Sequence, residues 1–378
     1  MAIFKESAPH LRRKASVTRM MVDVLIALAP TLIFSFVIYP IKTLTFYLIS
    51  VAIMIGSEFV YVGLRGLMPK DGLKHSFKER FNYAYKGKFN QNNILTAAIS
   101  AIIFTLIMPA GAPIYAVVVG ALAGIILGKL VFGGLGSNIF NPAAVGMLFA
   151  KVCFGGQYAA NVAPEYINYY QVADVSISPT VLTNKVVDGL PGLIENFNGA
   201  NLLDMFLGKM YGTLGEVYAV TIIIGAIYLL IRRSADIRVM LPYLGAFALF
   251  SLVAGLGFYA VDGVTNPFKF TLFMLLSGGV LFGGVFMLTD PVTSPINAPS
   301  RIIYAIVAAV FTILIRLFAA LPEGVGFSIL IANMVAVVLD HYEWSNPRYT
   351  WKKFLAMGLL VVIPAAVIFL VIKFGGVY

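Results

Sequence analysis

Two similar Gly-rich stretches lie about half a chain apart, each between strongly apolar segments. The first runs over 132–142 (FGGLGSNIFNP) and the second over 282–291 (FGGVFMLTDP). Glycines followed by a polar residue and Pro predict that the backbone leaves the helix, and unpaired amides cost several kcal/mol in hydrocarbon unless protein buries them. Matching interruptions in two halves of a membrane chain are typical of inverted repeats with a functional site where the repeats meet.

The apolar segments identify an integral membrane protein. Hydrophobic residues make up 60% of the 378 residues and charged residues 12%, against about half and about a quarter in soluble domains. No cleavage site follows the first apolar run, so we expect the first helix to remain in the mature protein. The predicted spans are 20–39, 44–64, 92–109, 113–131, a short one at 142–154, 216–231, 239–260, 268–288, 301–319, 323–340 and 353–373.

The charge pattern predicts the orientation in the membrane. Basic residues cluster in short loops beside apolar segments, so the positive-inside rule explains the net charge of +10 without a nucleic-acid partner. Alternation from a cytoplasmic N-terminus places the long, aromatic and acidic loop outside, where we expect a small ordered cap. The predicted domains are a first membrane repeat (1–154), an extracytoplasmic loop (155–215), a second membrane repeat (216–343) and an additional C-terminal helix (344–378).

Ionisable residues near the apolar spans are candidates for ion coupling. A charge near the bilayer centre costs at least roughly 2.5 kcal/mol, so such residues favour function or pairing. Glu58 lies deepest in its predicted span, whereas snorkelling or dipole pairing also explains residues near span ends. The single cysteine, Cys153, excludes an intrachain disulfide and any zinc or iron–sulfur site built from this chain's thiolates alone. The candidates are Glu58, Asp23, Glu216 and Asp340; the basic residues Lys129 and Arg316 also lie near apolar spans, and Lys129 is weighed for the same role.

The polar residues that end the two Gly-rich stretches are candidates for cofactor binding. Asn141-Pro142 and Asp290-Pro291 each place Pro where a helix could begin, with Asn or Asp as the N-cap. Capping alone is one interpretation. The other is that two half-helix N-termini face each other and attract an anionic or reducible group. The sequence leaves the occupant open.

Seven motifs lie in order along the chain: Ser7–Arg13, Val17–Pro30, Phe132–Ala143, Phe206–Glu216, Thr289–Thr293, Gly324–Asn333 and Leu339–His341. Together they resemble the RnfD/NqrB family of membrane flavoproteins from ion-pumping redox complexes. The resemblance extends to about residue 343 and implies an all-α polytopic membrane protein of two inverted five-helix repeats with broken half-helices; the extra C-terminal helix lies beyond it. It also implies a role in electron transfer.

The same resemblance implies a flavin mononucleotide (FMN) joined through its phosphate to a threonine in the outward loop. The family motif is Ser/Thr-Gly-Ala-Thr, usually preceded by an Asp. Here the best match is 174–182 (DVSISPTVL), which keeps Asp174 and Thr180 but replaces Gly-Ala with Ser-Pro. A rival alignment from Asp188 puts Ile194 at the acceptor position and would abolish covalent FMN. Thr180 could also be an ordinary turn residue, and Ser176, Ser178 and Thr183 are neighbouring hydroxyls.

Within the family, the short N-terminus before Pro9-His10 favours the D subunit of an Rnf complex. The resemblance then implies electron relay between ferredoxin and NAD coupled to Na⁺ or H⁺ movement, in a bacterial or archaeal cytoplasmic membrane. The implied partners are the lipid bilayer and the other Rnf subunits, both membrane and iron–sulfur or flavin subunits. A second flavin such as riboflavin stays open. The alternatives are the B subunit of a Na⁺-pumping NADH:quinone reductase and a non-redox channel or transporter of inverted-repeat fold.

Overall fold

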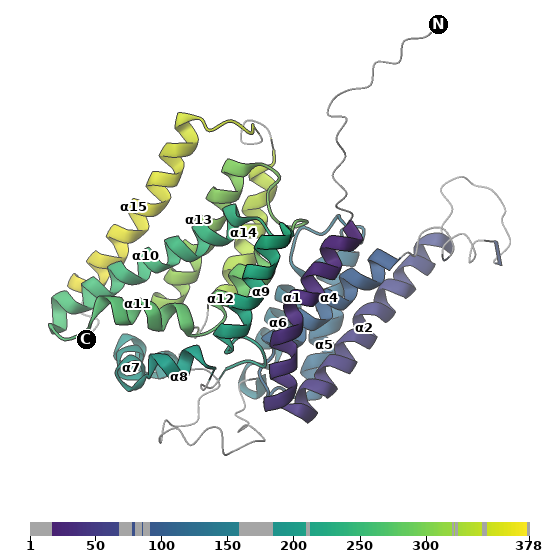
Figure 1. Cartoon of the computed structure of the whole chain (residues 1–378), viewed down its shortest axis with the longest axis horizontal. Helices are drawn as coiled ribbons and strands as arrows, with labels where there is room; N and C mark the ends of the chain where they lie inside the picture. The colour runs from purple at the N-terminus through teal and green to yellow at the C-terminus, as the bar shows by residue number, and fades with distance from the viewer. Residues whose placement is uncertain are drawn as a thin grey trace, which may run out of the picture.

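The computed structural model describes residues 17–67, 78–79, 85, 91–158, 184–208, 212–319, 321, 324–341 and 346–375, and this part of the chain is built from α-helices joined by turns and loops (Figure 1). Every predicted span falls on a helix or a helix pair. The elements are α1 (Val17–Ile38), α2 (Pro40–Leu67), α4 (Gln91–Ile107), α5 (Ile114–Ile125), the π-helical turn η2 (Ile126–Leu130), α6 (Pro142–Tyr158), α7 (Asn184–Gly199), α8 (Leu202–Phe206), α9 (Ala219–Arg232), α10 (Ile237–Asp262), α11 (Pro267–Leu276), α12 (Val280–Phe282), the π-helical turn η4 (Gly283–Met287), α13 (Ala298–Phe318), α14 (Val325–Leu339) and α15 (Trp351–Phe374).

The chain is a multi-pass membrane protein. Five helices of the described part, α1, α2, α10, α13 and α15, are long and apolar enough to cross a bilayer. α11 and 280–287 are long and apolar enough only together, and the 66° bend between them is that of a broken span or a re-entrant loop. The shorter apolar helices are α4, α5 with η2, α6, α9 and α14.

The helices form two groups that lie side by side (Figure 1). Helices α1 to α6 make one group and α10 to α15 the other, while α9 packs beside α1. The hydroxyl of Thr31 on α1 donates to that of Thr221 on α9 at 3.1 Å, and both residues are buried. α15 packs on α10 and α13 at the outer edge, with most of its surface exposed. The contact between the groups therefore runs along α1, α6, α9 and α14.

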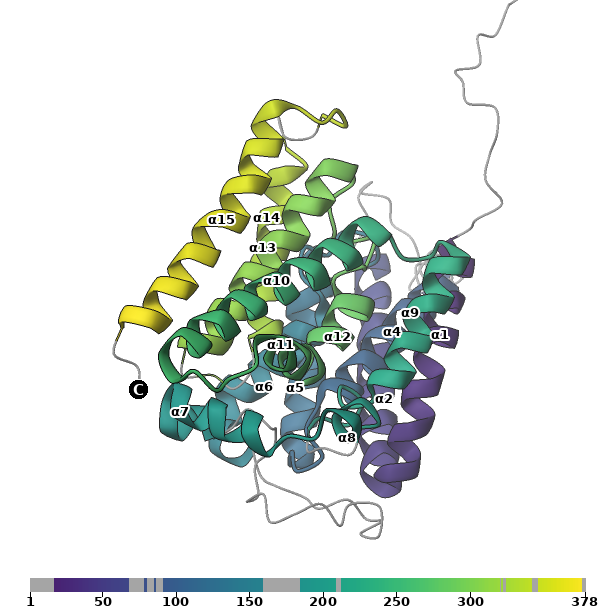
Figure 2. The same ribbon diagram turned by 60° about the vertical axis from the view of Figure 1, so that its left-hand side comes forward.

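The loop between the groups contains two helices at one end of the bundle, α7 and α8 (Figure 2). One face of α7 carries the buried residues Leu190, Leu193 and Phe197. The Phe197 ring contacts the rings of Phe270 and Phe273 on α11, with centroids 5.5 and 5.8 Å apart. Burial of this apolar face fixes α7 against the start of the second group of helices.

The chain leaves the helix at both Gly-rich stretches, as predicted, after Leu130 in the first and after Met287 in the second, but their glycines lie at different places on the backbone. After η2, Gly133 and Gly134 have φ angles of 119° and 90°, which favour glycine, and the chain leaves the helix. Gly283 and Gly284 lie inside η4 and are buried. A Cβ on Gly283 would lie 2.5 Å from Val325 Cγ1, so this glycine permits close helix packing. The second group has a further helix break at 277–279, before this stretch begins.

Candidate functional site between the two helix groups

A π-helical turn comes before each polar-Pro sequence. In η2 the Val131 N–H donates to the Ile126 carbonyl, and in η4 the Leu288 N–H donates to the Gly283 carbonyl, each bond reaching back five residues. Such single turns are frequent at functional sites. Gly128 allows η2 to approach the next helix, because a Cβ there would lie 2.8 Å from Pro142 Cα. The two π-turns therefore bring polar loops to the boundary between the groups.

Asn141 caps α6, as the sequence predicts. Its side-chain oxygen accepts from the N–H groups of Ala143 and Ala144 at 3.0 and 3.3 Å, and Pro142 is the first helical residue. Its amide nitrogen donates to the carbonyl of Met287, the last residue of η4, at 3.4 Å. With the amide of Asn333 oriented to satisfy both its ends, that side chain accepts from the Asn141 N–H at 2.9 Å. Asn141 thus joins the two helix groups.

Asp290 does not cap a helix, so the prediction of two facing helix N-termini is wrong. Its carboxylate accepts from the Val292 N–H at 3.0 Å, and its carbonyl accepts from the Ser294 N–H at 3.1 Å. These bonds close a turn. α13 begins only at Ala298, with Asn297 at its N-cap position. An Asp side chain accepts from backbone N–H groups in a turn as readily as at a helix end. Here the residues between Asp290 and Ala298 form turns, so Asp290 does not start α13.

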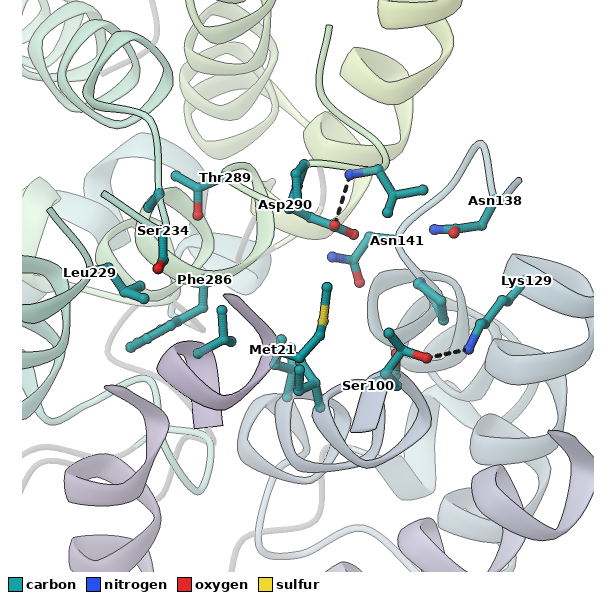
Figure 3. Close-up of a pocket in the computed structure, with 18 of the residues that line it drawn as sticks. Met21, Ser100, Lys129, Asn138, Asn141, Leu229, Ser234, Phe286, Thr289 and Asp290 are labelled. Carbon is teal, nitrogen blue, oxygen red and sulfur yellow. Dashed lines mark hydrogen bonds between the residues drawn. The ribbon is translucent and has the colours of Figure 1, made fainter. Parts of the chain in front are cut away.

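Asn141 and Asp290 nevertheless line one cavity of about 80 Å³ at the boundary between the groups (Figure 3). Lys129 and Asn138 lie on one side of it, and Ser234, Leu229 and Phe286 on the other. Its volume gives room for several water molecules or an ion with part of its hydration shell. Its polar lining consists of Thr96, Ser100, Lys129, Asn138, Asn141, Ser234, Thr289 and Asp290.

Glu58 forms a buried ion pair with Lys129. The Lys129 Nζ lies 3.0 Å from Glu58 Oε2, and the two side chains are 3% and 1% exposed. Asn93 donates to Glu58 Oε1 at 2.9 Å, and Lys129 donates to the Thr96 hydroxyl at 2.9 Å. Because Lys129 also lines the cavity, this pair connects α2 and α4 to the boundary between the groups.

Asp23 forms a second ion pair, across α1 and α9. The Arg232 Nε donates to its carboxylate at 3.1 Å, and the Ser234 hydroxyl donates at 2.6 Å. The carboxylate is buried, whereas the Arg232 side chain is 39% exposed. Asp23 is the seventh residue of α1. Its partner Arg232 comes from the other half of the chain.

Glu216 lies at the break in the second group, far along the chain from Asp290. A Cβ on Gly279 would lie 2.4 Å from Glu216 Oε1, so the carboxylate sits directly on this break. Arg316, fully buried, contacts the same bend: it donates to the Met274 carbonyl at 2.6 Å and to the Ser277 hydroxyl at 3.3 Å. A buried carboxylate and a buried guanidinium therefore both contact the bend between α11 and α12.

Asp340 is half-buried at the end of α14. Its carboxylate accepts from the Ile296 N–H at 2.9 and 3.3 Å, and so holds the loop that precedes α13. The four ion-coupling candidates thus lie at separate places. Glu58 forms an ion pair with Lys129 of the cavity lining, and Asp23 accepts a hydrogen bond from Ser234 of the same lining.

Thr180 and Asp174, the predicted FMN attachment residues, lie outside the described residues, as do Ser176, Ser178 and Thr183. The rival alignment falls within α7. There Ile194 is partly buried and packs against the hydrophobic core.

Sequence reasoning missed the network around the ion pair and the hydroxyls of the cavity. Glu58 and Lys129 were separate candidates, and their pairing needs the close packing of α2 against α5 and η2. Asn93 and Thr96 carry a readable signal, because two polar side chains three residues apart share one face of an apolar helix. The role of Ser234 could not be predicted in this way, since Ser is common in the residues that follow a helix.

Comparison with known proteins connects this architecture to one family. The family model for NQR2, RnfD and RnfE matches residues 4–348, which includes α1 to α14. The chain belongs to the NQR2, RnfD, RnfE family. The match ends before α15, so the last helix is an addition to the part that this family shares.

Three relatives show how the similarity is distributed over single proteins. Over 336 residues the chain is 27% identical to the D subunit of the Na⁺-translocating ferredoxin:NAD⁺ oxidoreductase complex of Acetobacterium woodii, covering 89% of this chain and 92% of that one. It is 28% identical to the proton-translocating counterpart of Clostridium ljungdahlii, covering 89% and 93%. It is 34% identical over 247 residues to the B subunit of the Na⁺-translocating NADH-quinone reductase of Chromohalobacter salexigens, covering 65% of this chain but only 57% of that relative's length.

Proposed function

We propose that this chain is the D subunit of an ion-translocating ferredoxin:NAD⁺ oxidoreductase of the Rnf type. The observation that carries the proposal is the extent of similarity. The chain spans 92–93% of the length of D subunits from Na⁺- or proton-translocating complexes. It spans only 57% of the length of a quinone reductase B subunit, to which its local identity is higher. Its role is to relay electrons within the complex, with other membrane, iron–sulfur and flavin subunits as partners and Na⁺ or H⁺ as the coupled ion.

We propose the division inferred from the sequence, in which 1–154 and 216–343 are inverted five-helix repeats, 155–215 is an extracytoplasmic cap and 344–378 adds one helix. The ends of the helices support the orientation. Arg19, Arg65 and Arg238 belong to the start of α1, the end of α2 and the start of α10. Figure 1 shows these three helix ends at the end of the bundle opposite α7. Positive residues mark the cytoplasmic side, so the cap faces outside.

The cap is the proposed place of a covalent FMN, joined through its phosphate to Thr180 near Asp174. The rival position is unsuited, because Ile194 has no hydroxyl and packs against the core from within α7. When bound, FMN supplies one- and two-electron transfer. The chain's own part is to offer the hydroxyl oxygen for the phosphoester, and α7 anchors the cap against α11 through Phe197.

The cavity beside Asn141 and Asp290 suits water or a monovalent cation better than a second flavin. Its volume of about 80 Å³ is far below the roughly 300–1,000 Å³ of sites that enclose small organic molecules. We therefore derive no step through a second flavin there. The carboxylate, amide and hydroxyl oxygens around the cavity are hard ligands of the kind that alkali cations prefer. Glu58, paired with Lys129 at its edge, is the leading candidate for ion coupling.

In-gel fluorescence of the purified chain tests the flavin assignment. A denaturing gel under ultraviolet light should show a fluorescent band at the mass of this chain, and Thr180→Ala should remove it. Thr183→Ala, three residues away in the same segment, is the matched control and should leave the fluorescence intact. Fluorescence that persists in Thr180→Ala would refute the attachment site. A dark band from the unaltered chain, with ion transport intact, would favour a non-redox channel.

A further inference from the structure

A second and larger cavity opens on the outer surface of the first helix group, between α2 and α5 with η2. It is a groove of about 550 Å³ with an apolar lining, and it lies on the side of α2 away from the buried carboxylate of Glu58. This volume lies within the roughly 300–1,000 Å³ of sites that hold small molecules. The groove is lined by Ala52, Ile53, Gly56, Ser57, Val60, Tyr61, Leu64, Leu122, Ile126, Leu130 and Val131.

The groove is not filled by the chain's own packing. A Cβ on Gly56 would meet no atom within 4 Å, so the space above this glycine is open. Val60, Leu64 and Val131 are 56%, 55% and 66% exposed along its walls. α2 is a candidate membrane span, so this apolar surface faces the hydrocarbon region.

A cation lies beside the groove. Arg65, exposed near the end of α2, donates from Nη1 to the Gly133 carbonyl at 3.0 Å and lies 3.5 Å from the Tyr61 hydroxyl. The guanidinium thus bridges the two walls, and it carries more N–H donors than these contacts use.

We propose that this groove binds an anionic phospholipid, with one acyl chain along the apolar walls and the headgroup phosphate at Arg65. The chemistry matches at both ends, because apolar walls take hydrocarbon and a guanidinium forms paired hydrogen bonds with phosphate. Basic pockets between membrane helices on the cytoplasmic side are typical sites for anionic headgroups.

The bound lipid also keeps water away from the ion pair of Glu58 and Lys129. Leu130 lines the groove and Lys129, its neighbour in η2, pairs with Glu58. An acyl chain in the groove covers the outer side of the turn that holds this ammonium, and so keeps water from entering beside it.

Lipid titration of the purified full chain tests the proposal without reference to flavin or ion transport. The chain is stripped of lipid in detergent and titrated with phosphatidylglycerol or with phosphatidylcholine of the same acyl chains, and bound lipid is counted by native mass spectrometry. We expect phosphatidylglycerol to bind about fivefold more tightly, since one basic residue near an anionic headgroup contributes about this factor.

Two variants separate the parts of the site. Gly56→Leu fills the groove and should remove this binding of both lipids, while Arg65→Gln should abolish the fivefold preference and leave weak binding of each. Gly358→Leu on α15 is the matched control, because a Cβ there also meets no atom within 4 Å, and it should change nothing. Equal binding by Gly56→Leu and the unaltered chain would overturn the proposal, as would a preference that survives Arg65→Gln. In the intact complex, a cross-link from Gly56→Cys to another subunit's helix would also overturn it.

Discussion

The two Gly-rich stretches have nearly the same opening letters and opposite structural roles. Phe132-Gly-Gly follows a π-turn, and its glycines take positive φ angles that release the chain into a loop. Phe282-Gly-Gly enters a π-turn, and its glycines let α14 and α10 approach within contact distance. Gly is used for conformational freedom in the first stretch and for its missing side chain in the second. A shared motif therefore predicts where helices meet, but not which property of glycine is used.

The largest effect that this comparison predicts is at the ion pair beside the first stretch. Glu58→Gln or Lys129→Met alone leaves a buried charge without its partner and should lower the free energy of unfolding in detergent by about 3–5 kcal/mol. The double variant removes both charges and should recover much of that loss. Additive losses in the double-mutant cycle would show that the pair is not coupled.

Glycine substitutions separate conformation from packing. Gly283→Ala should cost about 1–3 kcal/mol by overpacking against Val325, and Gly134→Ala about 1–2 kcal/mol because of its positive φ. Val325→Ala should relieve the cost of the first but not of the second, as measured by unfolding in detergent. Gly358→Ala, which meets open space, is the control with no loss expected. Relief of Gly134→Ala by Val325→Ala would contradict the distinction.

Asn141 and Asp290, the polar residues before Pro in the two stretches, should also respond differently to substitution. Asn141→Ala removes a helix cap and should cost about 1 kcal/mol, with faster hydrogen exchange at the Ala143 and Ala144 amides. Asp290→Ala opens a turn, so the first turn of α13 should keep its exchange protection. Loss of protection at Arg301 in Asp290→Ala would show that Asp290 supports α13 after all.

The smallest effect is expected at Asp23. Its partner Arg232 is 39% exposed, so solvent screens the pair and Asp23→Asn should cost only about 0.5–1 kcal/mol. The cost should fall at high salt if it arises from the charge pair. A loss as large as that of Glu58→Gln would mean that α1 and α9 depend on this carboxylate for their association.

Much of the fold follows from the sequence because hydrophobicity dominates in a membrane. All the predicted spans coincide with helices, and Asn141 caps α6 as its place before Pro142 suggests. The bend at 277–279 and the turn at Asp290 do not follow, since they depend on the packing of Gly279 against Glu216 and on the residues up to Asn297. The pairing of Glu58 with Lys129 likewise needs the contact of two helices distant in sequence.

Ferredoxin-driven ion uptake by inverted membrane vesicles of the source organism tests the central claim most directly. Vesicles from cells that contain this chain should accumulate Na⁺ or H⁺ when reduced ferredoxin and NAD⁺ are supplied. Vesicles from cells that lack only this chain should lose that uptake, and return of the gene should restore it. Undiminished ferredoxin-driven uptake in the absence of this chain would contradict its proposed place in the complex.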